Sequence, residues 1–176
     1  MKKICGNGLL TAALAVILVL VGIAYLQHHP LERSAEGDKL EILSLLEAYA
    51  GAYGRGETDT IIAQLPDDNE VIFLGSTADG ISKGKDAIRD QINHDLEQTE
   101  KVAMTITGRE IDINGNIAWI AADSVVHATI KGQSLVFPGR LTGVFEHTDK
   151  GWVWRQANFS LPLGAMSQGQ SFPRKN

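Results

Sequence analysis

The feature that most limits what this chain can fold into is an uncharged stretch near its N-terminus. Residues 4–26 contain no charged side chain, and Lys2 and Lys3 stand immediately before them. A helix needs roughly 20 apolar residues to span a bilayer, and flanking lysines tend to stay on the cytoplasmic side. The stretch predicts a transmembrane anchor within residues 1–27. The N-terminus would lie in the cytoplasm and the rest of the chain on the extracytoplasmic (periplasmic) side.

Two other interpretations of this stretch stay open. Gly22 and Ala24 have the small-residue spacing of a signal-peptide cleavage site, and cleavage after Ala24 would release the domain into the periplasm. A buried helix of a soluble domain fits poorly, because so long an uncharged run beside two lysines is unusual for a core helix. Cys5 is the only cysteine, so no intrachain disulfide can form.

The remainder of the chain has the composition of one acidic globular domain. The 176 residues carry a formal net charge of −5 and no cluster of Lys and Arg. This balance argues against binding to nucleic acid or to anionic lipid surfaces. We expect a tether at residues 28–37, a folded domain at 38–163 and a flexible tail at 164–176, where Gly, Ser and Gln are frequent.

The order of apolar patterns along the domain predicts helices first and strands afterwards. Helical spacing begins at Lys39 and ends at Gly54 and Gly56, a second short helix follows Thr58, and Pro66 stops it. A short strand at 70–75 precedes a third helix at 85–100. Four strands follow at 102–113, 117–130, 134–147 and 152–161. The order α-α-β-α-β-β-β-β indicates an α+β fold with helices on one face of an antiparallel sheet.

The strand patterns also predict local irregularities and a register. The apolar phase of the strand at 102–113 changes at Gly108, which is typical of a β-bulge. In the last hairpin, a turn that sets Thr148 opposite Trp152 also sets Arg140 opposite Ser160 and Thr142 opposite Asn158. Two interpretations of the more polar face stay open: it faces solvent, or it lines a pocket closed by the helices. That face carries Arg140, Thr142, Glu146, Trp154, Gln156, Asn158 and Ser160.

Several short segments, taken in order, resemble the SnoaL-like branch of the nuclear transport factor 2-like superfamily. They are Tyr53 to Asp59, Pro66-Asp67-Asp68, Gly84 to Ile88, Gly115 to Trp119, Arg140-Leu141-Thr142, Asp149 to Trp152 and Phe159 to Pro162. The ending is also similar to the association domain of calmodulin-dependent kinase II. The resemblance implies a cone-shaped curved sheet wrapped around three N-terminal helices and open at one end. It also implies a homodimer formed through the outer face of the sheet.

The resemblance does not bring an active site with it. Aligning Asp67-Asp68 with the corresponding pair of ketosteroid isomerase sets that enzyme's base position beside Phe73 and Leu74, which cannot take a proton. Relatives of this branch commonly carry His where this chain has Gln156 and Asn158. The weak catalytic candidate is Asp123, a carboxylate on the strand face of Trp119 and His127. We expect no metal site, because the five histidines lack ligand spacing, and we expect no cofactor.

Three functions remain open at this stage. The leading hypothesis is a membrane-tethered, non-enzymatic domain that binds a small ligand, anionic or not, or a protein partner. The alternatives are a small lyase, isomerase or hydrolase acting on an apolar carbonyl compound with Asp123 as base, and a structural dimerisation module. The anionic ligand rests on Arg140, which would need a negative partner if its face lined a pocket. The predicted pocket residues are Tyr49, Tyr53, Trp119, Arg140, Thr142, Trp154, Gln156 and Asn158.

Overall fold

The computed structural model describes residues 16, 18, 33–77 and 80–162. The chain divides into two compact units, residues 1–34 and 35–176. Within the described residues, no helix is long and apolar enough to cross a membrane. Apart from residues 16 and 18, the predicted anchor with its cleavage site lies outside that described part, and so does the predicted tail at 164–176.

The second unit contains three helices, as the sequence predicts, two at its start and one after the first two strands. They are α2 (Ala35–Arg55), α3 (Thr58–Ile62) and α4 (Lys85–Glu97). Helix α2 begins four residues before Lys39, inside the predicted tether. Its first turn carries Glu36 and Asp38, which suit a helix N-terminus, and Asp38 is buried and accepts a 3.0 Å hydrogen bond from Trp152 Nε1. This contact spans most of the domain, so the apolar pattern around Lys39 could not reveal it.

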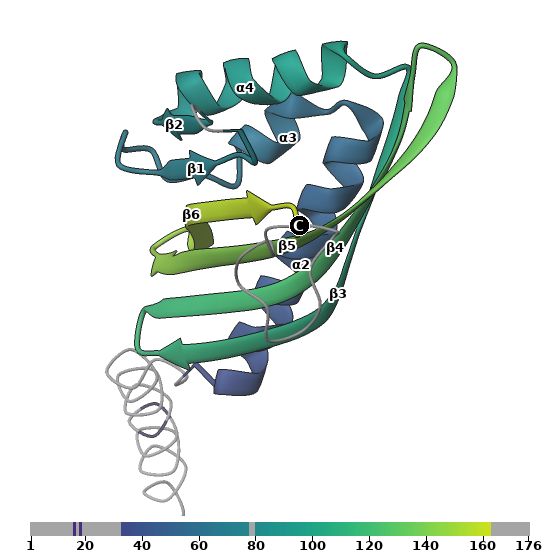
Figure 1. The fold of residues 1–176 in the computed structure, drawn as a ribbon. Coiled ribbons are helices and arrows are strands. Elements are labelled where there is room, and N and C mark those ends of the chain that lie inside the picture. The colour runs from purple at the N-terminus through teal and green to yellow at the C-terminus, as the bar shows by residue number, and fades with distance from the viewer. Residues whose placement is uncertain (1–15, 17, 19–32, 78–79, 163–176) are drawn as a thin grey trace, which may run out of the picture. The chain divides into compact units, whose positions relative to one another are not determined.

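The six strands form one curved sheet in the order β2-β1-β6-β5-β4-β3 (Figure 1). Their bounds are β1 Ile72–Leu74, β2 Ile81–Lys83, β3 Lys101–Asn114, β4 Ile117–Ile130, β5 Gln133–Thr148 and β6 Gly151–Ser160. The long strands curve around α2, and α4 lies across one end of the sheet (Figure 1). The predicted α+β class and the curved sheet are confirmed.

Two details of the predicted sheet are wrong. Strand β2 was not expected, so the order of elements is α-α-β-β-α-β-β-β-β. Three residues are too few to show an alternating pattern, and β2 forms because the backbone of Gly75 donates a 2.6 Å hydrogen bond to Gly80 where the chain reverses. The sheet is also not wholly antiparallel, because β1 pairs parallel to β6. That pairing depends on how distant segments dock and leaves no local signal.

The bulge predicted at Gly108 is confirmed. The β3–β4 register shifts between Thr107 and Glu110, and Gly108 has a φ of +56°, a region that glycine enters without the steric cost that a Cβ brings. A second bulge, which was not predicted, lies in the last hairpin. Val144 pairs with Gln156 and Phe145 with Trp154, so one extra residue, Arg155, stands in β6.

The second bulge explains why the predicted register is wrong next to the turn and correct farther along the hairpin. The pairs Arg140–Ser160 and Thr142–Asn158 are confirmed, whereas Thr148 pairs with Gly151 and not with Trp152. The turn is one residue shorter than expected, and the bulge at Arg155 restores the register beyond it. Because side chains alternate between the two faces of a strand, the extra residue moves Trp154 to the face that packs on α2.

Trp154 is the centre of the core between the sheet and α2. Its side chain is fully buried, its ring centroid lies 4.2 Å from that of Phe145 and 5.6 Å from that of Tyr49. Its Nε1 donates a 3.3 Å hydrogen bond to Gln64 Oε1. Gly143 lies beneath the ring, and a Cβ there would stand 2.5 Å from Trp154 Cζ3. The missing side chain of Gly143 therefore makes room for the indole.

Candidate functional site

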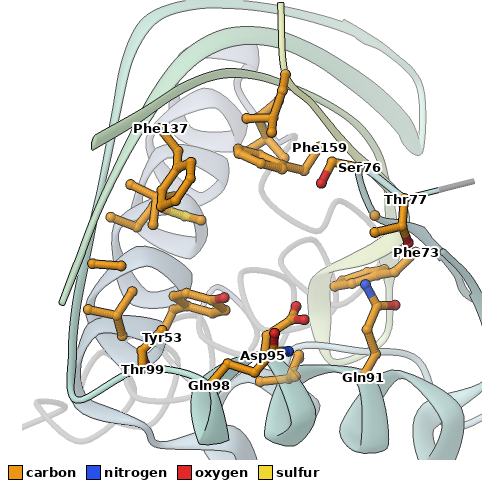
Figure 2. Close-up of a pocket in the computed structure, with 18 of the residues that line it drawn as sticks. Tyr53, Phe73, Ser76, Thr77, Gln91, Asp95, Gln98, Thr99, Phe137 and Phe159 are labelled. Atoms are coloured by element: carbon orange, nitrogen blue, oxygen red, sulfur yellow. The ribbon is translucent and has the colours of Figure 1, made fainter. Parts of the chain in front are cut away.

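A cavity of about 330 Å³ lies between the concave face of the sheet, α2 and α4. Figure 2 shows its wall, with Phe137 and Phe159 across the cavity from the α4 side chains and Phe73 beside Gln91. The α2 and α4 residues in the wall are Tyr49, Tyr53, Gln91, Ile92 and Asp95. The remaining wall residues come from the strands and the segments beside them: Phe73, Leu74, Gly75, Ser76, Thr77, Gln98, Thr99, Val102, Met104, Val126, Ala128, Ile130, Phe137, Leu141, Ala157, Phe159 and Leu161.

Aromatic rings give the cavity a rigid apolar wall. Tyr49 and Tyr53 are one helical turn apart on α2, and their rings stack with centroids 6.3 Å apart. Phe73 of β1 meets Tyr49 edge-on at 6.4 Å. Phe159 lies directly over Gly139, where a Cβ would stand 2.5 Å from Phe159 Cε2. Any side chain at position 139 would therefore press the Phe159 ring toward the cavity.

Among the described residues of the cavity wall, Asp95 of α4 is the one acidic group. Its side chain is half-buried, and loss of hydration raises the pKa of the Asp95 carboxyl, although the neighbouring His94 opposes the shift. The Tyr53 hydroxyl and the Asp95 carboxyl both point toward the open space of the cavity (Figure 2). Burial, together with the negative charge of Asp95, raises the pKa of Tyr53 to about 12. The Tyr53 phenol therefore stays protonated near neutral pH and can donate a hydrogen bond.

The comparisons with known proteins settle the family. A sequence model of the SnoaL-like domain matches residues 42–164. The chain belongs to the SnoaL-like domain family. The resemblance deduced from the short segments is thereby confirmed, and the matched residues contain the whole cavity. Among curated proteins, none matches this SnoaL-like chain significantly.

Solved structures of the nuclear transport factor 2-like superfamily share the fold. A superfamily member from Salmonella enterica serovar Typhimurium superposes with a TM-score of 0.71 at 19% identity, covering 79% of this chain and 100% of its own. A proposed dehydratase from Streptomyces avermitilis gives 0.68 at 15%, with 74% and 100% covered. A proposed calcium/calmodulin-dependent protein kinase II association domain from Xanthomonas campestris gives 0.63 at 18%, with 77% and 92% covered. At these identities the likeness concerns the fold alone.

The structure separates the predicted pocket residues of this SnoaL-like domain into three groups. Tyr49 and Tyr53 line the cavity. Trp154 lies in the core behind Tyr49 and not in the cavity wall. The other five lie on the outer face of the sheet, which we define as the face turned away from α2 and α4: Trp119, Arg140, Thr142, Gln156 and Asn158.

The placement of Arg140 corrects the argument for an anionic ligand. Arg140 is exposed and stands opposite Asp123 across the β4–β5 ladder, so its charge needs no ligand. The prediction that its face lines the pocket is wrong, because α2 and the cavity lie on the opposite, concave face of the sheet. Asp123 is equally exposed on the outer face, outside the cavity, which removes the reason to consider it a base acting in a pocket.

Asp95, Phe137 and Phe159 line the cavity, but they are not among the pocket residues predicted from the sequence. A signal existed for Asp95: it lies four residues after Gln91 and three after Ile92, so all three share one side of α4. The same side also carries Ile88, Ile92 and Leu96 at the apolar spacing of a core-facing helix. That spacing predicts a core face and conceals the acidic residue beside it. Phe137 and Phe159 carried no special pattern, because they alternate as core residues of any sheet do.

A second hollow, a groove of about 750 Å³, lies on another part of the surface. Its charged groups neutralise one another. Hydrogen bonds from Lys150 and Lys85 lower the pKa of Asp67 to about 2, and Arg155 holds both Asp68, at 2.7 Å, and Glu146. These pairs join the segment between α3 and β1 to α4, to the β5–β6 turn and to β6, so we assign the groove a structural role.

Proposed function

We propose that this chain presents a SnoaL-like domain that binds a small, largely apolar molecule in the cavity between α2, α4 and the sheet, without converting it. The observation that carries the proposal is the cavity itself, about 330 Å³ in volume, walled by aromatic and aliphatic side chains with few polar groups. Sites for small molecules have this character: an apolar hollow of a few hundred cubic ångströms with a small number of placed polar groups.

A cavity-filling substitution tests this proposal. N-phenyl-1-naphthylamine, a fluorescent and nearly neutral apolar probe, should bind to residues 35–176 and brighten. Val126→Phe adds a ring to the cavity wall and should lower the probe's affinity at least about ten-fold, since overfilling removes the space that binding needs. The matched control Val136→Phe lies on the outer face, 57% exposed, and should leave binding unchanged. Equal binding by both variants would mean that the probe sits elsewhere.

Residues 35–176 are a suitable unit for this measurement. Every large core residue lies between Ile42 and Ala157, and the Salmonella relative is covered over its whole length by a match to 79% of this chain. That relative therefore has the fold although it has no counterpart to the part of this chain outside that 79%.

A small lyase or isomerase is the second candidate, and Asp95 is the residue that favours it. A half-buried carboxyl with a raised pKa, beside a protonated tyrosine, is an arrangement suited to proton transfer. We prefer a binding role because no second carboxyl, imidazole or amine lines the described cavity wall. A role as a purely structural dimerisation module would leave the cavity without a use.

We also propose that residues 4–26 anchor the domain on the extracytoplasmic side of a membrane. The argument is the uncharged length of the stretch and the two preceding lysines. A protease added to intact bacterial spheroplasts should digest the domain while cytoplasmic proteins survive; a protected domain would refute the orientation. Mass spectrometry of the N-terminus distinguishes an uncleaved anchor from release after Ala24.

We propose, in addition, that two copies associate through the outer face of the sheet. Trp119 and Ile117 expose 46% and 42% of their surfaces there. Such an apolar surface on a soluble domain commonly marks a site of association.

A further inference from the structure

The cavity contains a carboxyl group with no charge to balance it. Among the described residues that line it, none is Lys, Arg or His. Both amides in the cavity wall near Asp95 are already engaged: Ser82 Oγ donates a 2.7 Å hydrogen bond to Gln91 Oε1, and Gln98 Nε2 donates a 3.0 Å hydrogen bond to the His94 carbonyl. Gln91 is also held at its other atom. Its Nε2 lies against Gly75, where a Cβ would stand only 2.8 Å away. The described residues therefore leave the Asp95 carboxyl without a hydrogen-bonded or ionic partner of its own.

The aromatic rings that border the same cavity as Asp95 favour positive charge. Aromatic faces attract cations through their quadrupole, most strongly where water is scarce. Tyr53 stands next to Asp95, and Phe73, Phe137 and Phe159 border the same space (Figure 2). An anionic ligand would bring a second negative charge to the Asp95 carboxylate. A neutral ligand would leave that carboxylate unpaired in a partly dehydrated site, which is costly.

We propose that the ligand of this cavity carries a protonated amine on an apolar body, with the ammonium group paired to Asp95 and the body held among the aromatic rings. This assignment rests on the proposed binding function and names its ligand class. The Tyr53 hydroxyl, which points into the same space as Asp95 (Figure 2), supplies an acceptor oxygen for a second ammonium hydrogen.

Three probes with the same phenyl body and different head groups test the proposal. They are 2-phenylethylamine, 2-phenylethanol and 3-phenylpropionate, titrated calorimetrically into the full chain in lipid nanodiscs, with empty nanodiscs as blank. The amine should bind at least about ten-fold more tightly than the alcohol, the factor expected for a charged hydrogen bond. The carboxylate should bind more weakly than the alcohol.

Asp95→Asn keeps the size of the side chain and removes its charge. The variant should lose the preference for the amine and bind amine and alcohol alike, while its affinity for the alcohol stays that of the parent protein. The matched control is Asp90→Asn on the exposed side of the same helix, which should keep the full preference. Asp95→Asn should fold. Because folding raises the pKa of Asp95, the folded protein loses stability as the pH rises through that pKa and the carboxyl ionises, and an amide at this position causes no such loss.

Binding of the amine should also weaken on acidification. Protonating Asp95 removes the negative partner, so affinity falls as the pH drops through the raised pKa of this carboxyl, and Asp95→Asn should show no such slope. His94 is the imidazole neighbour of Asp95 on α4, present equally in the parent protein and in Asp95→Asn, and the α2 phenols stay neutral over this range. The nearby cations on other parts of α4 and β2 are already paired: Arg89 with Asp59, and Lys83 with Glu70.

The outcomes distinguish the amine assignment from the proposed apolar binding function on which it rests. Equal binding of all three probes, or an amine preference that survives Asp95→Asn, overturns the amine assignment and leaves the apolar binding function standing. Binding of N-phenyl-1-naphthylamine without any binding of the amine also overturns it. Failure of the naphthyl probe and of all three phenyl probes overturns both.

Discussion

Replacing Trp154 by alanine is expected to cost about 3–5 kcal/mol of unfolding free energy, the range measured for truncating a fully buried large aromatic side chain. A natural domain has about 5–15 kcal/mol in all, so this single change would remove a large part of it. The reason is the position of the indole: it is 0% exposed and touches Phe145, Tyr49 and Phe73. Urea unfolding of residues 35–176, followed by far-UV circular dichroism, measures the loss.

Two further variants show whether burial is the cause. Trp154→Phe keeps an aromatic ring but leaves Gln64 Oε1 without its indole donor, and should cost about 1–3 kcal/mol. Leu40→Ala truncates a large apolar side chain that is 59% exposed on α2, and should change stability by no more than about 0.5 kcal/mol. A loss below about 1 kcal/mol for Trp154→Ala would contradict the core position of Trp154.

The fold was predictable wherever a pattern was long and local. Helices α2 and α4 repeat their apolar spacing over two or more turns, and the four long strands over several residue pairs. The glycine bulge at Gly108 disturbs that spacing visibly. Strand β2 and the parallel pairing of β1 with β6 have no such pattern. The bulge at Arg155 has none either, and it reverses the face on which Trp154 lies.

The candidate site was predictable only in part, for a related reason. Tyr49 and Tyr53 were identified because α2 is long and its apolar stripe is clear. The alternation of side chains along a strand shows which residues share a face of the sheet. It does not show which face the helices cover, so the outer-face residues were predicted to line a pocket. Asp95 could be recognised only when α4 was seen to lie across the open end of the sheet (Figure 1).

The outer-face residues then acquire a different expected role. Trp119 is 46% exposed and pairs with Val144 of β5 and Asp112 of β3 on that face. Ile117, 42% exposed, lies two residues away on the same side of β4. A single copy gains nothing by exposing these side chains, whereas a second copy placed on the same face would bury them.

Residues 35–176 are therefore expected to sediment as a dimer at about 10 μM, within the concentration range where a standard-sized interface is occupied. Trp119→Asp should convert the dimer into a folded monomer. A two-fold interface repeats every change, so one substitution brings two carboxylates into the buried surface. Unpaired buried charges cost several kcal/mol, which corresponds to a loss of at least about 100-fold in affinity. Sedimentation velocity with unfolding curves measures both properties.

The control for this experiment is Leu40→Asp, which makes the same exchange of an exposed apolar residue on α2. It should remain dimeric, because α2 packs on the opposite, concave side of the sheet. If Trp119→Asp and Leu40→Asp dissociate the dimer equally, the interface lies elsewhere or the effect is one of net charge. If the parent domain is a monomer even at about 100 μM, the exposed tryptophan has another partner, and the association of two copies through this face is refuted.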